Sequence, residues 1–166
     1  MNDKLALVAE DHPILTQVMP VVDKPKYVEI LSKGMFQLMW EKEGIGLAAP
    51  QVGMFLRMFI MGSKEGPHYV CINPEVIEVS ENQILDAEGC LTFPNLWLNI
   101  SRPEWVDARY QTLDGSIVER RFEGLMARCY LHELDHLNGI PFTTIVSKLK
   151  LDMAKKRRKK IMGDKR

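Results

Sequence analysis

Apolar residues recur at the spacing of a helix in two stretches of the chain. The first stretch is residues 24–42, where the apolar positions are Ile30 or Leu31, Met35, Leu38 and Met39. This helix is expected to stop at Glu43-Gly44. In residues 124–138 apolar side chains are spread around the whole circumference, which is typical of a helix buried among strands. Gly139 suits the left-handed position that ends a helix, and Pro141 prevents its continuation.

Short runs of buried or alternating residues lie between these two helices and predict strands. The expected strands are residues 55–61, 69–72, 75–79, 104–112 and 117–122. Residues 62–67 and 113–116 separate some of them and are rich in the Gly, Pro, Asp and Ser that favour turns. We therefore expect an α+β domain, in which small mixed or antiparallel strands pack around a central helix.

A third amphipathic segment follows and differs from the rest of the chain in charge. Its apolar positions are Ile145, Leu149, Leu151, Met153 and Ile161. Residues 148–166 contain 10 of the 22 Lys and Arg residues but only 2 of the 22 Asp and Glu residues, so the zero net charge of the chain hides a basic end. The sequence predicts a compact domain over residues 1–147, extended by a basic C-terminal helix over residues 148–166.

Length and composition limit the class of protein. A chain of 166 residues, 46% of them apolar, suits one globular domain with a core. It has no run of about eighteen apolar residues, and its start, Met1 to Lys4, lacks the basic and apolar regions of a secretory signal. Three widely spaced cysteines argue against a disulfide framework. We expect a cytoplasmic protein without membrane contact, and a monomer by default.

The segment from His132 to His136, of sequence HELDH, carries the candidate chemistry. Side chains four residues apart on a helix stack about 6 Å from each other, so both imidazoles can reach one ion. Glu133 points about 100° away from His132 and can contact a water on that ion instead. The spacing therefore predicts two metal ligands and a general base, and it requires a third ligand from elsewhere.

The three cysteines are the first candidates for the third ligand. An ion between the two histidines would lie roughly 7 Å along the helix from Cys129, whereas a ligating cysteine keeps its backbone within about 5 Å of the metal. Cys71 lies in a strand pattern and is expected in the core. Cys90 follows Gly89, which allows close backbone approach, and it precedes the proline that ends its segment. Cys90 is the predicted third ligand.

Residues 137–166 contain no His or Glu that could serve as the downstream third ligand of a two-histidine zinc protease. The two aspartates in this range lie in the charged tail. A site with one thiolate, two imidazoles and one open position follows, and such a site suits zinc or ferrous iron.

Three segments together resemble the signatures of the peptide deformylase family. The segments are Gly44-Ile45-Gly46-Leu47-Ala48-Ala49-Pro50-Gln51, Glu88-Gly89-Cys90-Leu91-Thr92 and Leu131-His132-Glu133-Leu134-Asp135-His136. The family patterns are G-x-G-L-A-A-x-Q, E-G-C-L-S and Q-H-E-x-D-H, in the same order. The resemblance covers nearly the whole chain and implies a metallohydrolase that removes the formyl group from the initiator methionine of nascent polypeptides.

This resemblance implies a role for each matching residue. The implied ligands of one divalent ion, in the family most often ferrous iron with zinc, nickel or cobalt able to replace it, are Cys90, His132 and His136. Glu133 would act as the general base. The side-chain amide of Gln51 and the backbone N–H of Leu91 would donate to the oxyanion.

The resemblance also implies a substrate site. The methionine side chain would enter an apolar pocket lined by Ile45, Leu125, Cys129 and the face of His132. Gly46 and Gly89 would let the peptide backbone approach in an extended pairing.

Four positions depart from the family pattern. Asp86 stands where the family commonly has an aliphatic residue, and Trp97 stands where bacterial members often have arginine. Both differences bear on which residues the enzyme prefers after methionine. Thr92 in place of Ser and Leu131 in place of Gln are expected to have small effects. Behind the metal helix, a pair between Arg102 and Asp135 is expected to brace the site.

The basic helix over residues 148–166 is expected to contact the ribosome, as the C-terminal helix of bacterial deformylases does. The setting would be a cytosol that starts proteins with formylmethionine, in a bacterium or a virus-infected bacterium, or else an organelle. Two alternatives stay open: a metalloprotease, disfavoured by the missing downstream ligand, and an RNA- or ribosome-binding protein with a structural metal. A structural site is usually closed by a fourth protein ligand, which neither Cys71 nor Cys129 is placed to supply.

Overall fold

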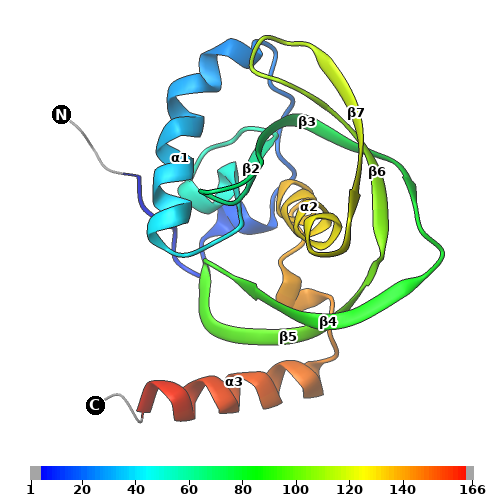
Figure 1. Cartoon of the computed structure of the whole chain (residues 1–166). Coiled ribbons are helices and arrows are strands. Elements are labelled where there is room, and N and C mark those ends of the chain that lie inside the picture. The colour runs from blue at the N-terminus through cyan, green and yellow to red at the C-terminus, as the bar shows by residue number, and fades with distance from the viewer. Residues whose placement is uncertain (1–4, 164–166) are drawn as a thin grey trace.

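A five-stranded antiparallel sheet curves around one side of a central helix, α2 (Gly124–Leu137), as Figure 1 shows. The computed structural model describes residues 5–163, so the predicted features of residues 1–4 and 164–166 lie outside the described residues. In the order β1-β2-β3-β6-β7, the strands of the sheet are Gly46–Ala48, Met58–Gly62, His68–Val79, Trp105–Gln111 and Ile117–Glu123. The predicted α+β class is confirmed.

A two-stranded hairpin lies on another side of α2. Its strands are β4 (Gln83–Cys90) and β5 (Phe93–Pro103), paired antiparallel with a register shift between Glu88 and Cys90. The hairpin passes beneath α2 in Figure 1 and brings the end of β4 towards that helix. The helix is thereby enclosed between the sheet and the hairpin. A site formed by its side chains would be shielded from solvent.

Apolar packing on three sides explains this arrangement. Side chains of α2, including Ala127, Tyr130 and Leu137, are buried against the five-stranded sheet. The N-terminal helix α1 (Glu29–Glu41) packs its buried side chains on the other face of β1 and β2. The C-terminal helix α3 (Lys148–Gly163) lies along β5 (Figure 1) and buries Ala154 there.

The predicted elements are present but differ in extent. The helix predicted over residues 24–42 begins at Glu29, after a short 3-10 helix over Pro25–Val28. Residues 69–72 and 75–79, predicted as separate strands, form one strand, β3, because Asn73 adopts a left-handed conformation (φ 50°) and the register shifts between Ile72 and Glu75. The predicted strand of residues 55–61 begins only at Met58. The hairpin of β4 and β5 is absent from the predicted strands. No helix within residues 5–163 is long and apolar enough to cross a membrane.

Candidate active site

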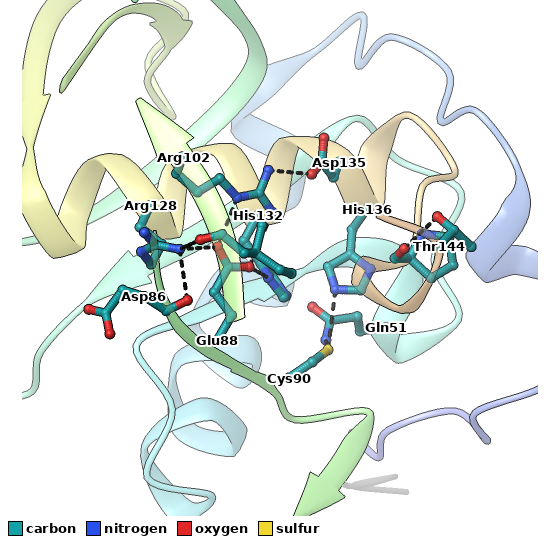
Figure 2. Close-up of polar contacts among 12 residues, drawn as sticks. Gln51, Asp86, Glu88, Cys90, Arg102, Arg128, His132, Asp135, His136 and Thr144 are labelled. Atoms are coloured by element: carbon teal, nitrogen blue, oxygen red, sulfur yellow. Dashed lines mark hydrogen bonds and ion pairs between the residues drawn. The ribbon is translucent and has the colours of Figure 1, made fainter. Parts of the chain in front are cut away.

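The ligand atoms of Cys90, His132 and His136 converge between the end of β4 and helix α2. All of these atoms lie within 4.8 Å of one another, and together they could hold a metal ion. The Nε2 atom of His136 lies 3.3 Å from the sulfur of Cys90 (Figure 2). Both histidines are buried, whereas Cys90 is partly exposed. The convergence agrees with the expected ligand set, and a thiolate with two imidazoles suits a catalytic metal that keeps an open position.

Glu88, two residues before Cys90 on β4, orients the first of these histidines. Its Oε2 atom lies 2.9 Å from Nδ1 of His132, which leaves Nε2 of the ring for the site. Burial alone would raise the pKa of Glu88, but hydrogen bonds from His132 and Arg102 and their charges lower it to about 2. The buried carboxylate is therefore held ionised behind the imidazole, an arrangement that fixes the ring and raises its basicity as a ligand.

Two arginines neutralise Glu88 from either side (Figure 2). Arg102 on β5 donates from Nε at 2.8 Å and from Nη2 at 3.1 Å, and Arg128 on α2 donates from Nη1 at 2.8 Å. Arg102 also donates to Asp135 Oδ2 at 2.7 Å, so the expected pair is present. Three elements, β4, β5 and α2, are tied together directly behind His132.

Glu133 lies in the wall of the site next to Gly46 and Cys129. A Cβ atom placed on Gly46 would collide with Oε1 of Glu133 and would come within 2.6 Å of the sulfur of Cys129. The side chain is buried, and burial raises the pKa of Glu133 to about 7. Its Oε2 atom has no hydrogen-bond partner among the described residues. A buried carboxylate with one free oxygen, beside three side chains that could hold a metal ion, can accept a proton from a water molecule.

Gln51 reaches the same site from the turn after β1 (Figure 2). Its Oε1 atom accepts from the backbone N–H of Ala48 at 2.7 Å, and its Nε2 atom donates to Thr92 Oγ1 at 3.1 Å and to the Cys90 sulfur at 3.4 Å. These bonds fix the orientation of the amide and turn its N–H group towards the sulfur. Such a preoriented donor can stabilise negative charge that develops on a substrate oxygen.

A cavity of about 590 Å³ opens from this site to the surface. All the residues expected at the substrate site line it, namely Ile45, Gly46, Gly89, Leu125 and Cys129, and so do Gln51, Leu91 and Glu133. Trp97 lines it as well. Asp86 is exposed and is not among the lining residues, so the structure gives it no direct place in this cavity.

Most of the chain matches one known protein family. The model of the family described as polypeptide deformylase matches residues 4–152. The chain belongs to the polypeptide deformylase family. It is 44% identical to a peptide deformylase of Mesorhizobium japonicum, over 96% of this chain and 93% of that one. A peptide deformylase of Wolbachia pipientis wMel is 37% identical over 93% of each chain.

Solved deformylase structures share the fold. The structure of a Synechococcus elongatus deformylase in complex with actinonin superimposes with a TM-score of 0.87 at 32% identity, over 93% of this chain and 87% of that one. The Thermotoga maritima enzyme gives 0.82 at 34% identity, over 86% of this chain and 97% of that one. Deformylases are metal-dependent hydrolases that remove the formyl group from N-formylmethionyl nascent peptides, and this chain is an enzyme of that kind. Family membership sets aside the metalloprotease and the structural RNA-binding protein.

Sequence analysis did not assign a role to three polar residues around the deformylase site. The resemblance implies no role for Glu88 or Arg128, and it predicts only a small effect for Thr92. The signal for Arg128 is its charge on a helix that is predicted to be buried on all sides, since a buried charge needs a partner. The contact of Thr92 with Gln51 joins residues 41 positions apart and has no sequence signature.

Proposed function

We propose that Cys90, His132 and His136 hold the catalytic ion of this deformylase, and that this ion is ferrous iron in the cell. The convergence of their ligand atoms within 4.8 Å supports the proposal more directly than any other observation. Zinc, nickel and cobalt suit the same mixed sulfur and nitrogen donors and are the alternatives. When bound, such an ion polarises the formyl carbonyl and lowers the pKa of a water molecule.

Glu133 is the proton carrier in this proposal. Its partner-free Oε2 atom accepts a proton from the attacking water, whose oxygen bonds to the formyl carbon. Glu133 then delivers that proton to the nitrogen of the methionine as the carbon–nitrogen bond breaks. Formate and a peptide with a free amino terminus are the products.

The oxyanion is stabilised by Gln51 and Leu91. The Nε2 group of Gln51, held by Thr92 and facing Cys90, donates to the formyl oxygen as it gains negative charge. The backbone N–H of Leu91, directly after Cys90 in the turn between β4 and β5, is the second donor. Gln51 and Leu91 belong to different elements of the fold. The hydrogen bond from Gln51 to Thr92 connects these elements.

The methionine side chain occupies the inner part of the cavity in this proposal. Ile45, Leu125, Cys129 and His132 line the cavity, and of these Cys129 and His132 are buried. Gly46 on β1 and Gly89 on β4 both line the cavity, and each lacks a side chain where, in this proposal, the peptide backbone approaches.

Replacing Glu133 tests the central step. The Glu133→Gln variant should keep its bound metal and its folding, while its kcat on a formyl-Met-Ala-Ser peptide falls about 10²- to 10⁴-fold. Glu119→Gln, an exposed change on β7, is the matched control and should leave kcat unchanged. Wild-type turnover by Glu133→Gln would refute the assigned role, and failure of the wild-type protein to release formate would refute the function.

The identity of the metal needs its own experiment. Protein purified without oxygen should contain iron in a ratio near one per chain and should lose activity in air as ferrous iron is oxidised. Zinc-loaded protein, prepared by exchange, is the control because it resists oxidation. Zinc in the anaerobic protein, with full activity, would overturn the assignment of iron.

The basic helix α3 is proposed to bind the ribosome, as an extension of the catalytic domain of residues 1–147. It packs on β5 through Leu151 and Ala154, and Arg158 forms an ion pair with Glu10 at 2.7 Å. The exposed cations of the helix include Lys155, Lys156, Lys159 and Lys160. These four lysines are free to meet RNA phosphates without disturbing the packed face.

Changing the four lysines to glutamine tests this contact better than removing the helix, because truncation would uncover the apolar surface of β5. Ribosome binding by the wild type should weaken steeply with salt, and the quadruple variant should bind more weakly with a smaller salt dependence. Equal binding by both would refute the proposal. The protein is proposed to act as a monomer in the cytosol, where nascent formylated chains emerge.

A further inference from the structure

Three polar side chains of α2 lie on the side of the helix that faces β4 (Figure 2). Arg128, His132 and His136 are spaced four residues apart, which places them in a row at intervals of about 6 Å. On a strand, every second residue lies on the same face, at intervals of about 6.6 Å. The two intervals nearly match, so successive turns of α2 can contact successive same-face residues of β4.

The contacts between the helix and the strand follow this match. Arg128 donates from Nη1 to Oε1 of Glu88 at 2.8 Å, and Nδ1 of His132 lies 2.9 Å from the other oxygen of the same carboxylate. One turn further along α2, Nε2 of His136 lies 3.3 Å from the sulfur of Cys90, two residues after Glu88. The order of the contacts is therefore the same along both elements, which defines one register of β4 against α2.

Arg128 is also bonded to the backbone of the hairpin. Its Nη2 atom donates to the carbonyl oxygen of Ile84 at 2.6 Å, and its Nη1 atom donates to that of Ile100 at 2.8 Å and to that of Asp86 at 3.5 Å. Arg128 is 7% exposed, so water cannot readily replace these bonds. Ile84 and Asp86 lie on β4 and Ile100 lies on β5, so one guanidinium ties both strands to α2.

The pairing of β4 with β5 does not by itself place Cys90. Between Glu88 and Cys90 the register shifts, because Gly89 alone separates them on β4 whereas residues 94–97 separate their partners on β5. The regular ladder is interrupted there, and glycine restrains the backbone least of all residues. Contacts of β4 with α2 therefore position Cys90, and those of Arg128 include the backbone itself.

We propose that Arg128 is a positioning residue that sets the register of β4 against α2, and through it the distance from Cys90 to His132 and His136. Its role rests on the proposed function, which takes these last three residues as the metal ligands. Protein ligands bind ions such as zinc at about 2.0–2.3 Å, so a small displacement of β4 would withdraw the thiolate while both imidazoles stay in place on α2. Removal of Arg128 should therefore loosen the sulfur ligand selectively.

Cobalt is the probe for the sulfur ligand, because a thiolate bound to Co²⁺ adds a charge-transfer absorption in the near ultraviolet. Arg128→Met removes the charge and the hydrogen bonds, whereas Arg128→Lys keeps a charge beside Glu88 but cannot span the backbone oxygens of both strands. In both variants the absorbance of this band per bound cobalt should fall about twofold or more, and the affinity for cobalt, measured by competition with a chelator, should fall about 10- to 100-fold.

A second readout needs neither metal nor activity. Amide hydrogen exchange of residues 83–90 in metal-free protein should be about tenfold faster in both Arg128 variants than in the wild type, because the strand is no longer held to α2.

Arg57→Met is the matched control. Arg57 donates from Nη1 to Oδ1 of Asn138, directly after α2, at 3.0 Å and from Nη2 to the carbonyl oxygen of Pro74 at 3.5 Å. Neither of these partners belongs to the hairpin. The control should lose some stability to urea but keep the wild-type cobalt spectrum and the wild-type exchange in residues 83–90.

Different results would overturn the two claims. A wild type without the thiolate band would show that Cys90 is not a ligand, so the proposed function would fail at its metal site, while exchange would still decide whether Arg128 holds β4. If the wild type has the band and Arg128→Lys matches it in both readouts, the charge suffices and the register role is refuted. Equal losses in Arg57→Met would refute it as well, because any arginine beside α2 would then have the same effect. Arg128→Lys carries the test if Arg128→Met does not fold.

Discussion

The Nδ1 atom of His132 lies 2.9 Å from Oε2 of Glu88, and the same carboxylate binds Arg102 and Arg128. Glu88 is therefore shared between the imidazole of His132, a proposed metal ligand, and two buried cations. Replacing Glu88 should therefore change two quantities that can be measured separately, the affinity for the metal and the free energy of unfolding.

Glu88→Gln should weaken metal binding and folding together. The amide cannot provide the charge that holds the His132 ring, so affinity for the metal should fall about 10- to 100-fold, as measured by competition with a chelator. Arg102 and Arg128 would also lose their buried counter-charge, at a cost of about 3–5 kcal/mol in the free energy of unfolding, measured with urea on metal-free protein. Unchanged chelator competition would show that Glu88 does not orient the ligand.

Gly46→Ala should inactivate the enzyme by crowding Glu133. The added methyl group would collide with Oε1 of Glu133 and press on the sulfur of Cys129, and both neighbours are buried in a packed wall. Overpacking of this kind costs about 1–3 kcal/mol of stability, and kcat should fall at least 100-fold because the proposed proton carrier is displaced.

Gly163→Ala is the control for Gly46→Ala, because a Cβ atom at Gly163 meets nothing within 4 Å. The control should match the wild type in kcat and in unfolding midpoint. A Gly46→Ala protein with wild-type kcat would mean that Glu133 can move without loss and would contradict the proposed proton transfer.

Local patterns predicted the helices and the pair of histidines that converges with Cys90, because that information lies within a few residues. The spacing of His132 and His136 is a property of one helix, and the reach argument against Cys129 needed only the rise per residue. The hairpin was harder to predict. In β4 most side chains are exposed, so the usual burial signal is weak, although β5 alternates buried Leu96, Leu98 and Ile100 with exposed residues.

Contacts between distant segments were outside the reach of sequence reasoning. The bond from Gln51 to Thr92, and the packing of Trp97 on Gly89, depend on the register of the hairpin and on how it lies against β1. A single sequence does not encode that register in any local pattern. The left-handed Asn73 similarly allows β3 to continue through a break that looked like the end of a strand.

The two cysteines of the site should behave differently when replaced. Cys90→Ala removes a proposed ligand and should abolish metal binding at stoichiometric metal. Cys129 is buried and is not one of the three residues whose ligand atoms converge. Its sulfur lies 3.4 Å from the backbone oxygen of Ile45. Cys129→Ala should therefore keep its metal and lose about 1 kcal/mol of stability. Metal analysis after gel filtration distinguishes the two, and loss of metal from Cys129→Ala would contradict the assignment.

Replacements at Gln51 and Thr92 should give a graded series of activities. Gln51→Ala removes a proposed oxyanion donor, so kcat should fall about 10²- to 10³-fold. Thr92→Val keeps the shape of the side chain but removes the hydroxyl that accepts from Gln51 Nε2, so the amide can rotate and kcat should fall by a smaller factor of about ten. Thr92→Ser keeps the hydroxyl and should stay within about twofold of wild type. If Thr92→Val were as active as Thr92→Ser, the hydroxyl would have no part in positioning Gln51. Equal activity of Gln51→Ala and wild type would remove the amide from the mechanism altogether.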